Sequence, residues 1–188
     1  MNNSVPDAAS STIAGTTAQD HLDRLCLTVE DFPRPGISFR DLTPVFADGP
    51  AFRAVIDDLM GPFTGQFDVV AGIEARGFLL AAAVAYATGT GVVAVRKPGK
   101  LPRPVHSESY SLEYGEASLE IHRDDVVPGT RVLILDDVLA TGGTLAAATA
   151  LFDSCGAEVV GCAVVLELQA LQGRQTVQQY RVHAVAAA

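Results

Sequence analysis

Two neighbouring carboxylates followed by a glycine-rich turn form the segment of this sequence best suited to chemistry. Residues 131–144 read RVLILDDVLATGGT, so a short apolar run ends in Asp136 and Asp137. In an open α/β sheet, ligands bind beyond the carboxyl ends of the strands. Carboxylates there can accept hydrogen bonds from sugar hydroxyls or hold a hydrated Mg²⁺. We therefore expect both aspartates to lie in a ligand-binding site.

The turn after the aspartates suits a phosphate group. Residues 141–144 (TGGT) precede an Ala-rich stretch that predicts a helix. Two glycines let the backbone approach a ligand closely, and the free N–H groups of a helix start favour an anion. Either feature alone would be explained as an ordinary strand end or helix cap. The two in this order favour a sugar phosphate, and the segment has neither the GxxxxGK[ST] nor the GxGxxG pattern of other phosphate sites.

The elements that must position these residues predict an α/β fold with an open, mainly parallel sheet flanked by helices. Short apolar runs alternate with Ala- and Leu-rich stretches, as such a sheet requires when both faces are covered. The expected strands are 68–73, 91–95, 131–135, 158–166 and 181–185. The expected helices are 51–60, 77–87, 143–155 and 168–180, with Gly156 as a left-handed helix stop.

One segment departs from this alternation of strands and helices. Residues 107–122 have alternating character on both sides of Gly115 and Glu116, which predicts an antiparallel hairpin turning at these two residues. The basic, Pro- and Gly-containing stretch RKPGK (96–100) precedes it. We expect the two together to form a flap that projects from the sheet.

Length and composition limit the classes of protein to which the chain can belong. Its 188 residues predict one domain over residues 20–188, folded from near His21, after a mobile extension over residues 1–19. A net charge of −9 argues against non-specific binding of nucleic acid. No window approaches the roughly 18 apolar residues of a membrane span. No Lys or Arg precedes Arg24, so we do not expect a secretory signal and expect the protein to be cytoplasmic.

The 131–144 run resembles the phosphoribosyl pyrophosphate (PRPP) signature of the type I phosphoribosyltransferases, in the form found in their adenine-specific members. Four further blocks match that family in order, and together they cover most of residues 22–180. These blocks are DFPRPGISFRDLTP (31–44), GIEARGF (72–78), VRKPGKLP (95–102) and YSLEYG (110–115). The resemblance implies the type I phosphoribosyltransferase fold, with an N-terminal hood and a β-hairpin flap. It also implies a purine salvage reaction, in which PRPP and adenine give AMP and pyrophosphate.

The resemblance implies how PRPP is bound. Asp136 and Asp137 would bind the ribose hydroxyls, and Arg76 would contact the pyrophosphate from a turn that contains a cis non-proline peptide in the family. The loop that would bind the 5′-phosphate comprises Ala140, Thr141, Gly142, Gly143 and Thr144. Further positive charge around the pyrophosphate would come from Arg96, Lys97 and Lys100. Mg²⁺ is the implied cofactor, held mainly by PRPP and water near the two aspartates.

The hood and the flap would serve the base. By resemblance, the backbone groups of Ser38 and Arg40 recognise adenine while Phe39 stacks on its ring. Glu113 would act in the flap as general acid or base, with Tyr114 beside it, and Arg76 would share the catalytic role. Part of the basic loop reaches a neighbouring subunit in the family, which implies a homodimer.

Most of these roles have an ordinary structural alternative. Arg76 could form a surface salt bridge, Lys97 and Arg103 could belong to a solvated loop, and Glu113 could be a simple hairpin carboxylate. For Phe32 we expect packing into the core rather than contact with a ligand.

Two other functions share the PRPP signature. A relative acting on another base would differ in the hood, and the 31–44 block favours adenine. A non-catalytic regulator that senses PRPP and binds DNA would need a basic N-terminal module, whereas residues 1–23 contain no Lys or Arg.

Overall fold

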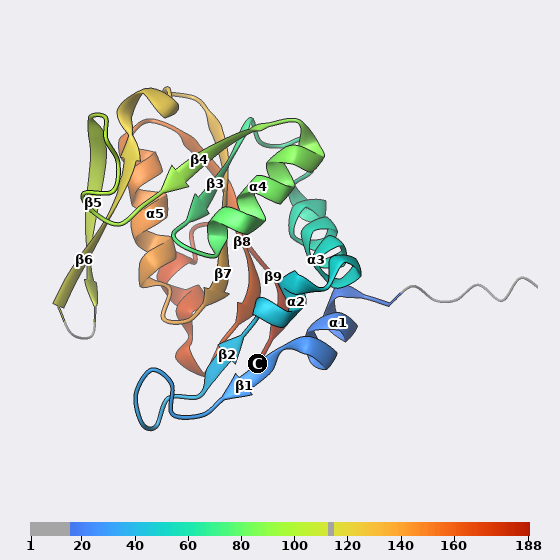
Figure 1. Ribbon diagram of the computed structural model, residues 1–188. Coiled ribbons are helices and arrows are strands. Elements are labelled where there is room, and N and C mark those ends of the chain that lie inside the picture. The colour runs from blue at the N-terminus through green and yellow to red at the C-terminus, as the bar shows by residue number, and fades with distance from the viewer. Residues whose placement is uncertain (1–15, 113–114) are drawn as a thin grey trace, which may run out of the picture.

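A five-stranded parallel sheet forms the centre of the molecule (Figure 1). The computed structural model describes residues 16–112 and 115–188. The strand order is β4-β3-β7-β8-β9, which confirms the predicted open parallel sheet. The strands are β3 (Val69–Ile73), β4 (Gly91–Val95), β7 (Arg131–Leu139), β8 (Glu158–Glu167) and β9 (Val182–Ala187). Strand β7 continues four residues beyond the predicted end, so both aspartates lie inside it.

Helices cover both faces of the sheet and enclose two hydrophobic clusters. One cluster includes buried residues of α1, α3 and α4, and the other includes those of α5 and strand β6. The helices are α1 (Ala18–Leu25), α2 (Thr43–Ala47), α3 (Gly49–Met60), α4 (Gly77–Thr88) and α5 (Gly143–Ser154). Gly156 has φ +72°, which confirms the left-handed stop after α5. Among the described residues, no helix is long and apolar enough to cross a bilayer.

The first helix begins three residues before the predicted start of the fold at His21. Thr17 and Asp20 form a capping box, in which the Thr17 Oγ1 accepts from the Asp20 N–H at 3.1 Å and Asp20 Oδ2 accepts from the Thr17 N–H at 2.9 Å. This reciprocal pair starts α1 at Ala18. The rest of the expected extension, residues 1–15, lies outside the described residues.

The predicted helix over 168–180 is wrong. Two 3₁₀ turns stand there, η3 (Gln169–Leu171) and η4 (Gly173–Val177). Gln172 separates them with a left-handed φ of +51°, which a continuous α-helix does not allow. Residues after Gln172 are therefore free to pack elsewhere, and they lie against the start of α5 (Figure 1).

The predicted hairpin is present and projects from the sheet (Figure 1). Its strands are β5 (Val105–Leu112) and β6 (Gly115–His122). Gly115 and Glu116 pair with Leu112 and Ser111, so they belong to β6 and the prediction that they form the turn is wrong. Backbone hydrogen bonds of 2.9 and 2.7 Å between Arg96 and Glu120 join the hairpin to the end of β4.

A second, smaller sheet forms the hood. Strands β1 (Leu27–Val29) and β2 (Phe39–Asp41) pair in antiparallel fashion, with Val29 opposite Phe39. The connection between them contains a cis Phe32-Pro33 bond and a turn in which Asp31 accepts from the Gly36 N–H at 2.7 Å. This hood lies at the end of the molecule where β7 finishes (Figure 1).

Candidate active site

A polar cavity of about 400 Å³ opens at the carboxyl ends of β3 and β7. This is the sheet edge at which α/β proteins bind ligands. The lining residues are Ile73, Glu74, Ala75, Arg76, Lys97, Leu119, Asp136, Asp137 and Thr144. The structure thus brings together residues from three of the sequence blocks, 72–78, 95–102 and 131–144, and adds Leu119 of the hairpin.

The two aspartates of β7 are buried at this edge, with 9% and 7% of their surface exposed. Burial raises the pKa of Asp136 well above its ordinary value, and the charge of the adjacent Asp137 raises it further. Asp137 Oδ2 is enclosed and forms an ion pair with Arg76 Nη2 at 2.6 Å. The guanidinium therefore offsets the charge of this buried carboxylate.

Arg76 stands in a tight turn between β3 and α4. The Glu74-Ala75 peptide in that turn is cis, as the resemblance implied. A Cβ on Gly77 would lie 2.7 Å from the Leu135 carbonyl oxygen, so only glycine lets the turn pack so closely on β7. This contact sets the backbone of Arg76 beside the aspartates.

The basic loop after β4 is held to the same turn by Glu74. Glu74 Oε2 accepts from the Lys97 N–H at 3.0 Å and from Arg96 Nε at 3.4 Å. The Lys97 hydrogen bond, with help from Arg96, lowers the pKa of Glu74. Lys97 lines the cavity, whereas Arg96 donates to the Lys100 carbonyl at 3.2 Å, and neither Arg96 nor Lys100 is part of the lining. Arg96 therefore shapes the loop that presents Lys97.

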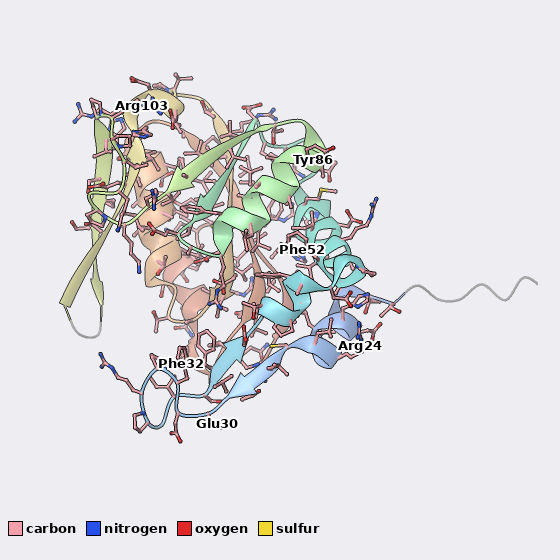
Figure 2. The ribbon with its side chains drawn as sticks, viewed as in Figure 1. Arg24, Glu30, Phe32, Phe52, Tyr86 and Arg103 are labelled. Atoms are coloured by element: carbon pink, nitrogen blue, oxygen red, sulfur yellow. The ribbon has the colours of Figure 1, made fainter. Side chains whose placement is uncertain are left out.

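Arg103 belongs to a solvent-exposed loop, which was the structural alternative to a role in the site. Its Nη2 lies 2.7 Å from Asp125 Oδ1, and both side chains are substantially exposed. Figure 2 shows Arg103 at the opposite end of the molecule from Phe32 in the hood.

A small pocket of about 50 Å³ adjoins the cavity at the start of α5. Gly142, with φ +84°, is the N-cap residue, and no side chain caps this described helix. The N–H groups of its first turn are therefore available to an anion. The lining residues are Val138, Leu139, Ala140, Thr141, Gly142, Thr144 and Leu145. Four of the five predicted phosphate residues thus line one pocket, and Gly143 begins the helix beneath them.

A third, mostly apolar pocket of about 400 Å³ lies under the hood and shares Arg76 with the polar cavity. The Phe32 and Phe39 rings meet edge to face with their centroids 5.1 Å apart. The Arg76 guanidinium carbon lies 5.3 Å from the centroid of the Phe39 ring. The lining residues are Val29, Phe32, Phe39, Asp41, Thr43 and Arg76. A flat aromatic ligand suits such walls.

The prediction that Phe32 packs into the core is wrong. The residue is 51% exposed, because a backbone hydrogen bond from Phe32 N–H to the Ile37 carbonyl holds it in the hood turn, away from the core, and its side chain lines the apolar pocket. Figure 2 shows Phe32 in the hood. Phe39 lines the pocket as expected, whereas Ser38 and Arg40 on either side of it are not part of the lining. Ser38 Oγ donates to Glu30 at 3.1 Å and Arg40 Nη1 donates to Thr28 at 3.0 Å, so both side chains are engaged away from the pocket.

Several residues around the site were not predicted from the sequence. Val29, Asp41 and Thr43 line the apolar pocket, and only the pairing of β1 with β2 brings Val29 there. Gly173 and Thr176 pack against residues 140–142 without any sequence signal of their own, and Thr176 lies 35 residues beyond its partner Thr141. The predicted catalytic Glu113 and its neighbour Tyr114 lie outside the described residues.

Comparisons with known proteins agree with this geometry. The family described as "Phosphoribosyl transferase domain" matches residues 46–184. Adenine phosphoribosyltransferase of Renibacterium salmoninarum is 65% identical over 167 residues, which are 89% of this chain and 92% of that protein.

Solved structures extend the likeness to three dimensions. Adenine phosphoribosyltransferase of Rhodothermus marinus has a TM-score of 0.87 and 47% identity, covering 91% of this chain and 98% of that one. The enzyme of Saccharomyces cerevisiae, complexed with an imino-altritol bisphosphate and adenine, has a TM-score of 0.83 and 36% identity, covering 89% and 97%.

Proposed function

The chain belongs to the phosphoribosyl transferase domain family, and we infer that it is an adenine phosphoribosyltransferase, a purine salvage enzyme. It transfers phosphoribose from PRPP to adenine and yields AMP and pyrophosphate. The observation that carries this function is the pair of pockets that share Arg76, one polar at the sheet edge and one apolar under the hood. A reaction that joins a purine to a sugar phosphate requires its two substrates side by side.

The polar side of the site binds PRPP. The N–H groups at the start of α5 receive the 5′-phosphate, because a helix start favours an anion. Asp136 and Asp137 accept hydrogen bonds from the ribose hydroxyls, which is supported by their place in the lining of the polar cavity. Arg76 and Lys97 face the pyrophosphate, with Arg96 holding the loop and Lys100 adding positive charge near it.

The apolar side of the site binds adenine. The adenine ring stacks on Phe39, and the neighbouring Phe32 ring enlarges the apolar contact surface. Because the Ser38 and Arg40 side chains are engaged elsewhere, recognition of the base edge falls to their backbone groups. Backbone N–H and C=O groups supply both the donor and the acceptor that an adenine edge needs.

Bond breaking in this reaction separates charge. The ribose becomes oxocarbenium-like while negative charge gathers on the departing pyrophosphate, so Arg76 and Lys97 stabilise the transition state from fixed positions. Glu113, in the flap with Tyr114, serves as the general acid or base at the attacking nitrogen of adenine. Closure of the hairpin over the site keeps water from the cation.

Mg²⁺ is the proposed cofactor, and the residues present fit it as a partner of the substrate. Asp136 and Asp137 supply oxygen donors of the kind Mg²⁺ prefers. No group of three or more metal-ligating side chains occurs within the described part of the chain. Mg²⁺ would thus be held mainly by PRPP and water, where it neutralises charge on the pyrophosphate.

We further propose a homodimer, formed through the outer face of α4. No charged residue occurs from Gly77 to Gly91, and Leu79, Tyr86 and Val92 are 54%, 93% and 48% exposed. An uncharged apolar face of this kind is typical of an interface. Light scattering of the wild-type protein and of Tyr86→Glu tests it, with a monomeric wild type as the contrary result.

The cytoplasm is the proposed location, because all three cysteines are free thiols.

The decisive experiment is an assay of pyrophosphate release by the purified protein with PRPP and Mg²⁺. Adenine, hypoxanthine, xanthine and orotate are supplied in turn. Of the four bases, only adenine should cause release of pyrophosphate, and omission of Mg²⁺ should abolish that release. Release with another base but not with adenine would redirect the assignment to a different phosphoribosyltransferase, and no release with any base would refute the enzymatic function.

A further inference from the structure

The loop assigned to the 5′-phosphate is supported from behind by the 3₁₀ turn η4. The two backbones meet at a pair of glycines. A Cβ on Gly173 would lie 2.1 Å from the Ala140 carbonyl oxygen and 2.8 Å from the Gly142 nitrogen. A Cβ on Gly142 would lie 2.3 Å from the Gly173 carbonyl oxygen. Each glycine is therefore needed for the close approach of the other segment.

A side-chain hydrogen bond adds direction to this contact. The Thr176 Oγ1 donates to the Thr141 carbonyl oxygen at 2.9 Å. Because the peptide between Thr141 and Gly142 is planar, a fixed carbonyl also fixes the opposed N–H of Gly142. That N–H belongs to the group at the start of α5 that binds the phosphate.

The supporting turn is itself firmly attached to the sheet. Arg174 donates from Nε to Glu167 at 3.1 Å and from Nη2 to the same carboxylate, and its Nη1 donates to the Val182 carbonyl at 2.6 Å. Val177 is completely buried. The turn can therefore hold the loop in place.

We propose that Gly173 and Thr176 are positioning residues for the 5′-phosphate of PRPP. The proposal rests on the function inferred above, because it takes residues 140–144 as the phosphate loop. Neither residue touches the substrate in this role. They hold the N–H groups of the loop in the orientation that a phosphate requires, and a displacement of such groups by a fraction of an ångström weakens binding.

The test measures binding of two probes by calorimetry, ribose 5-phosphate and inorganic pyrophosphate with Mg²⁺. Thr176→Val removes the hydroxyl at nearly constant volume, and Thr176→Ser retains it. Thr64→Val is the matched control, because Thr64 Oγ1 also donates to a backbone carbonyl, that of Met60, outside the described pockets. Thermal unfolding of each variant accompanies the titrations.

The valine variant should bind ribose 5-phosphate about threefold more weakly, as expected for loss of one solvent-accessible hydrogen bond. Its affinity for pyrophosphate should stay unchanged, and the serine variant and the Thr64→Val control should both match wild type. Gly173→Ala, a second variant, should lower the affinity for ribose 5-phosphate about tenfold or more while the affinity for pyrophosphate is kept.

Unchanged binding of ribose 5-phosphate by both Thr176→Val and Gly173→Ala would overturn the proposal. So would an equal loss for both probes, since that indicates general disruption. The proposed function is judged separately by pyrophosphate release from wild type with adenine. If wild type releases pyrophosphate with adenine but both variants bind ribose 5-phosphate as tightly as wild type, the positioning role is refuted and the proposed function stands.

Discussion

Removal of the Arg76 side chain should affect catalysis and stability by separable amounts. Arg76 lines both large pockets, forms an ion pair with Asp137 at 2.6 Å and lies over the Phe39 ring. Hydrogen bonds from a charged group to the pyrophosphate contribute about 1.5–3 kcal/mol each. Two such bonds lost in Arg76→Ala predict a decrease in kcat/KM for PRPP of about 10²–10⁴-fold.

The same substitution leaves Asp137 buried without its cation. The side chain of Asp137 is only 10% exposed, so the loss is larger than at a surface pair and should reach about 1–3 kcal/mol. For a chain of this length, each kcal/mol lowers Tm by roughly 2–4 °C. The protein should therefore remain folded at 25 °C.

Arg103→Ala is the matched control for this prediction. Its ion pair with Asp125 is similarly short, at 2.7 Å, but the Asp125 side chain is 33% exposed and neither residue lines the polar cavity or the pocket under the hood. An exposed pair contributes about 0–1 kcal/mol, so Tm and kcat/KM should stay close to wild type. Arg76→Lys should fall between, because lysine keeps the charge without the forked donors.

The assay combines steady-state kinetics of AMP formation with thermal unfolding of all four proteins. A value of kcat/KM near wild type in Arg76→Ala would refute the role of Arg76 at the pyrophosphate. Equal losses of activity in Arg76→Ala and Arg103→Ala would show that the position of Arg76 in the two pockets does not account for the loss, because Arg103 lines neither of them.

Three further predictions address the carboxylates and the hood. The pKa of Asp136 is raised in the fold, so the charged carboxylate lowers the stability of the wild type as pH rises above the unfolded pKa of about 4. Asp136→Asn should therefore have a larger free energy of unfolding in urea than wild type at pH 8, and this difference should narrow toward pH 4. A difference that stays constant with pH would contradict burial of the charged carboxylate as its cause. Phe39→Ala should raise KM for adenine by about 10-fold or more, since stacking of a base on an aromatic ring contributes about 1–3 kcal/mol, while an equal increase in KM for PRPP would argue against stacking. Glu74→Gln, which weakens the acceptor for Lys97 and Arg96, should raise KM for PRPP by about 3- to 10-fold in initial-rate measurements, and an unchanged KM would show that the loop does not depend on this carboxylate.

The residues assigned to the PRPP side could be placed together from the sequence because they are neighbours in the chain. Asp136, Asp137 and the 141–144 turn follow one another along the chain, so one strand and one helix start suffice to place them together. The five strands were predicted for a similar reason. A strand buried on both faces must be apolar throughout, and that pattern needs no knowledge of its neighbours.

The predictions that failed depend on contacts between distant segments. The 168–180 region has helical composition, yet Gln172 is left-handed and Gly173 packs against Ala140. Phe32 is a large apolar residue of the kind that usually packs in a core. It instead lines a pocket to which Arg76, 44 residues away in the sequence, also contributes. Neither outcome is encoded in the residues adjacent to it.

The parallel α/β sheet and the turn assigned to phosphate follow from patterns among neighbouring residues, which is why they could be predicted. The family could be predicted because five motifs keep their order between residues 31 and 144. Three arrangements come from the folded chain alone: Arg76 lines both large pockets, Glu74 holds the basic loop, and Gly173 and Thr176 pack behind residues 140–142. Packing of separate segments at one sheet edge produces these contacts, and their energies come from distances that no pattern along the chain specifies.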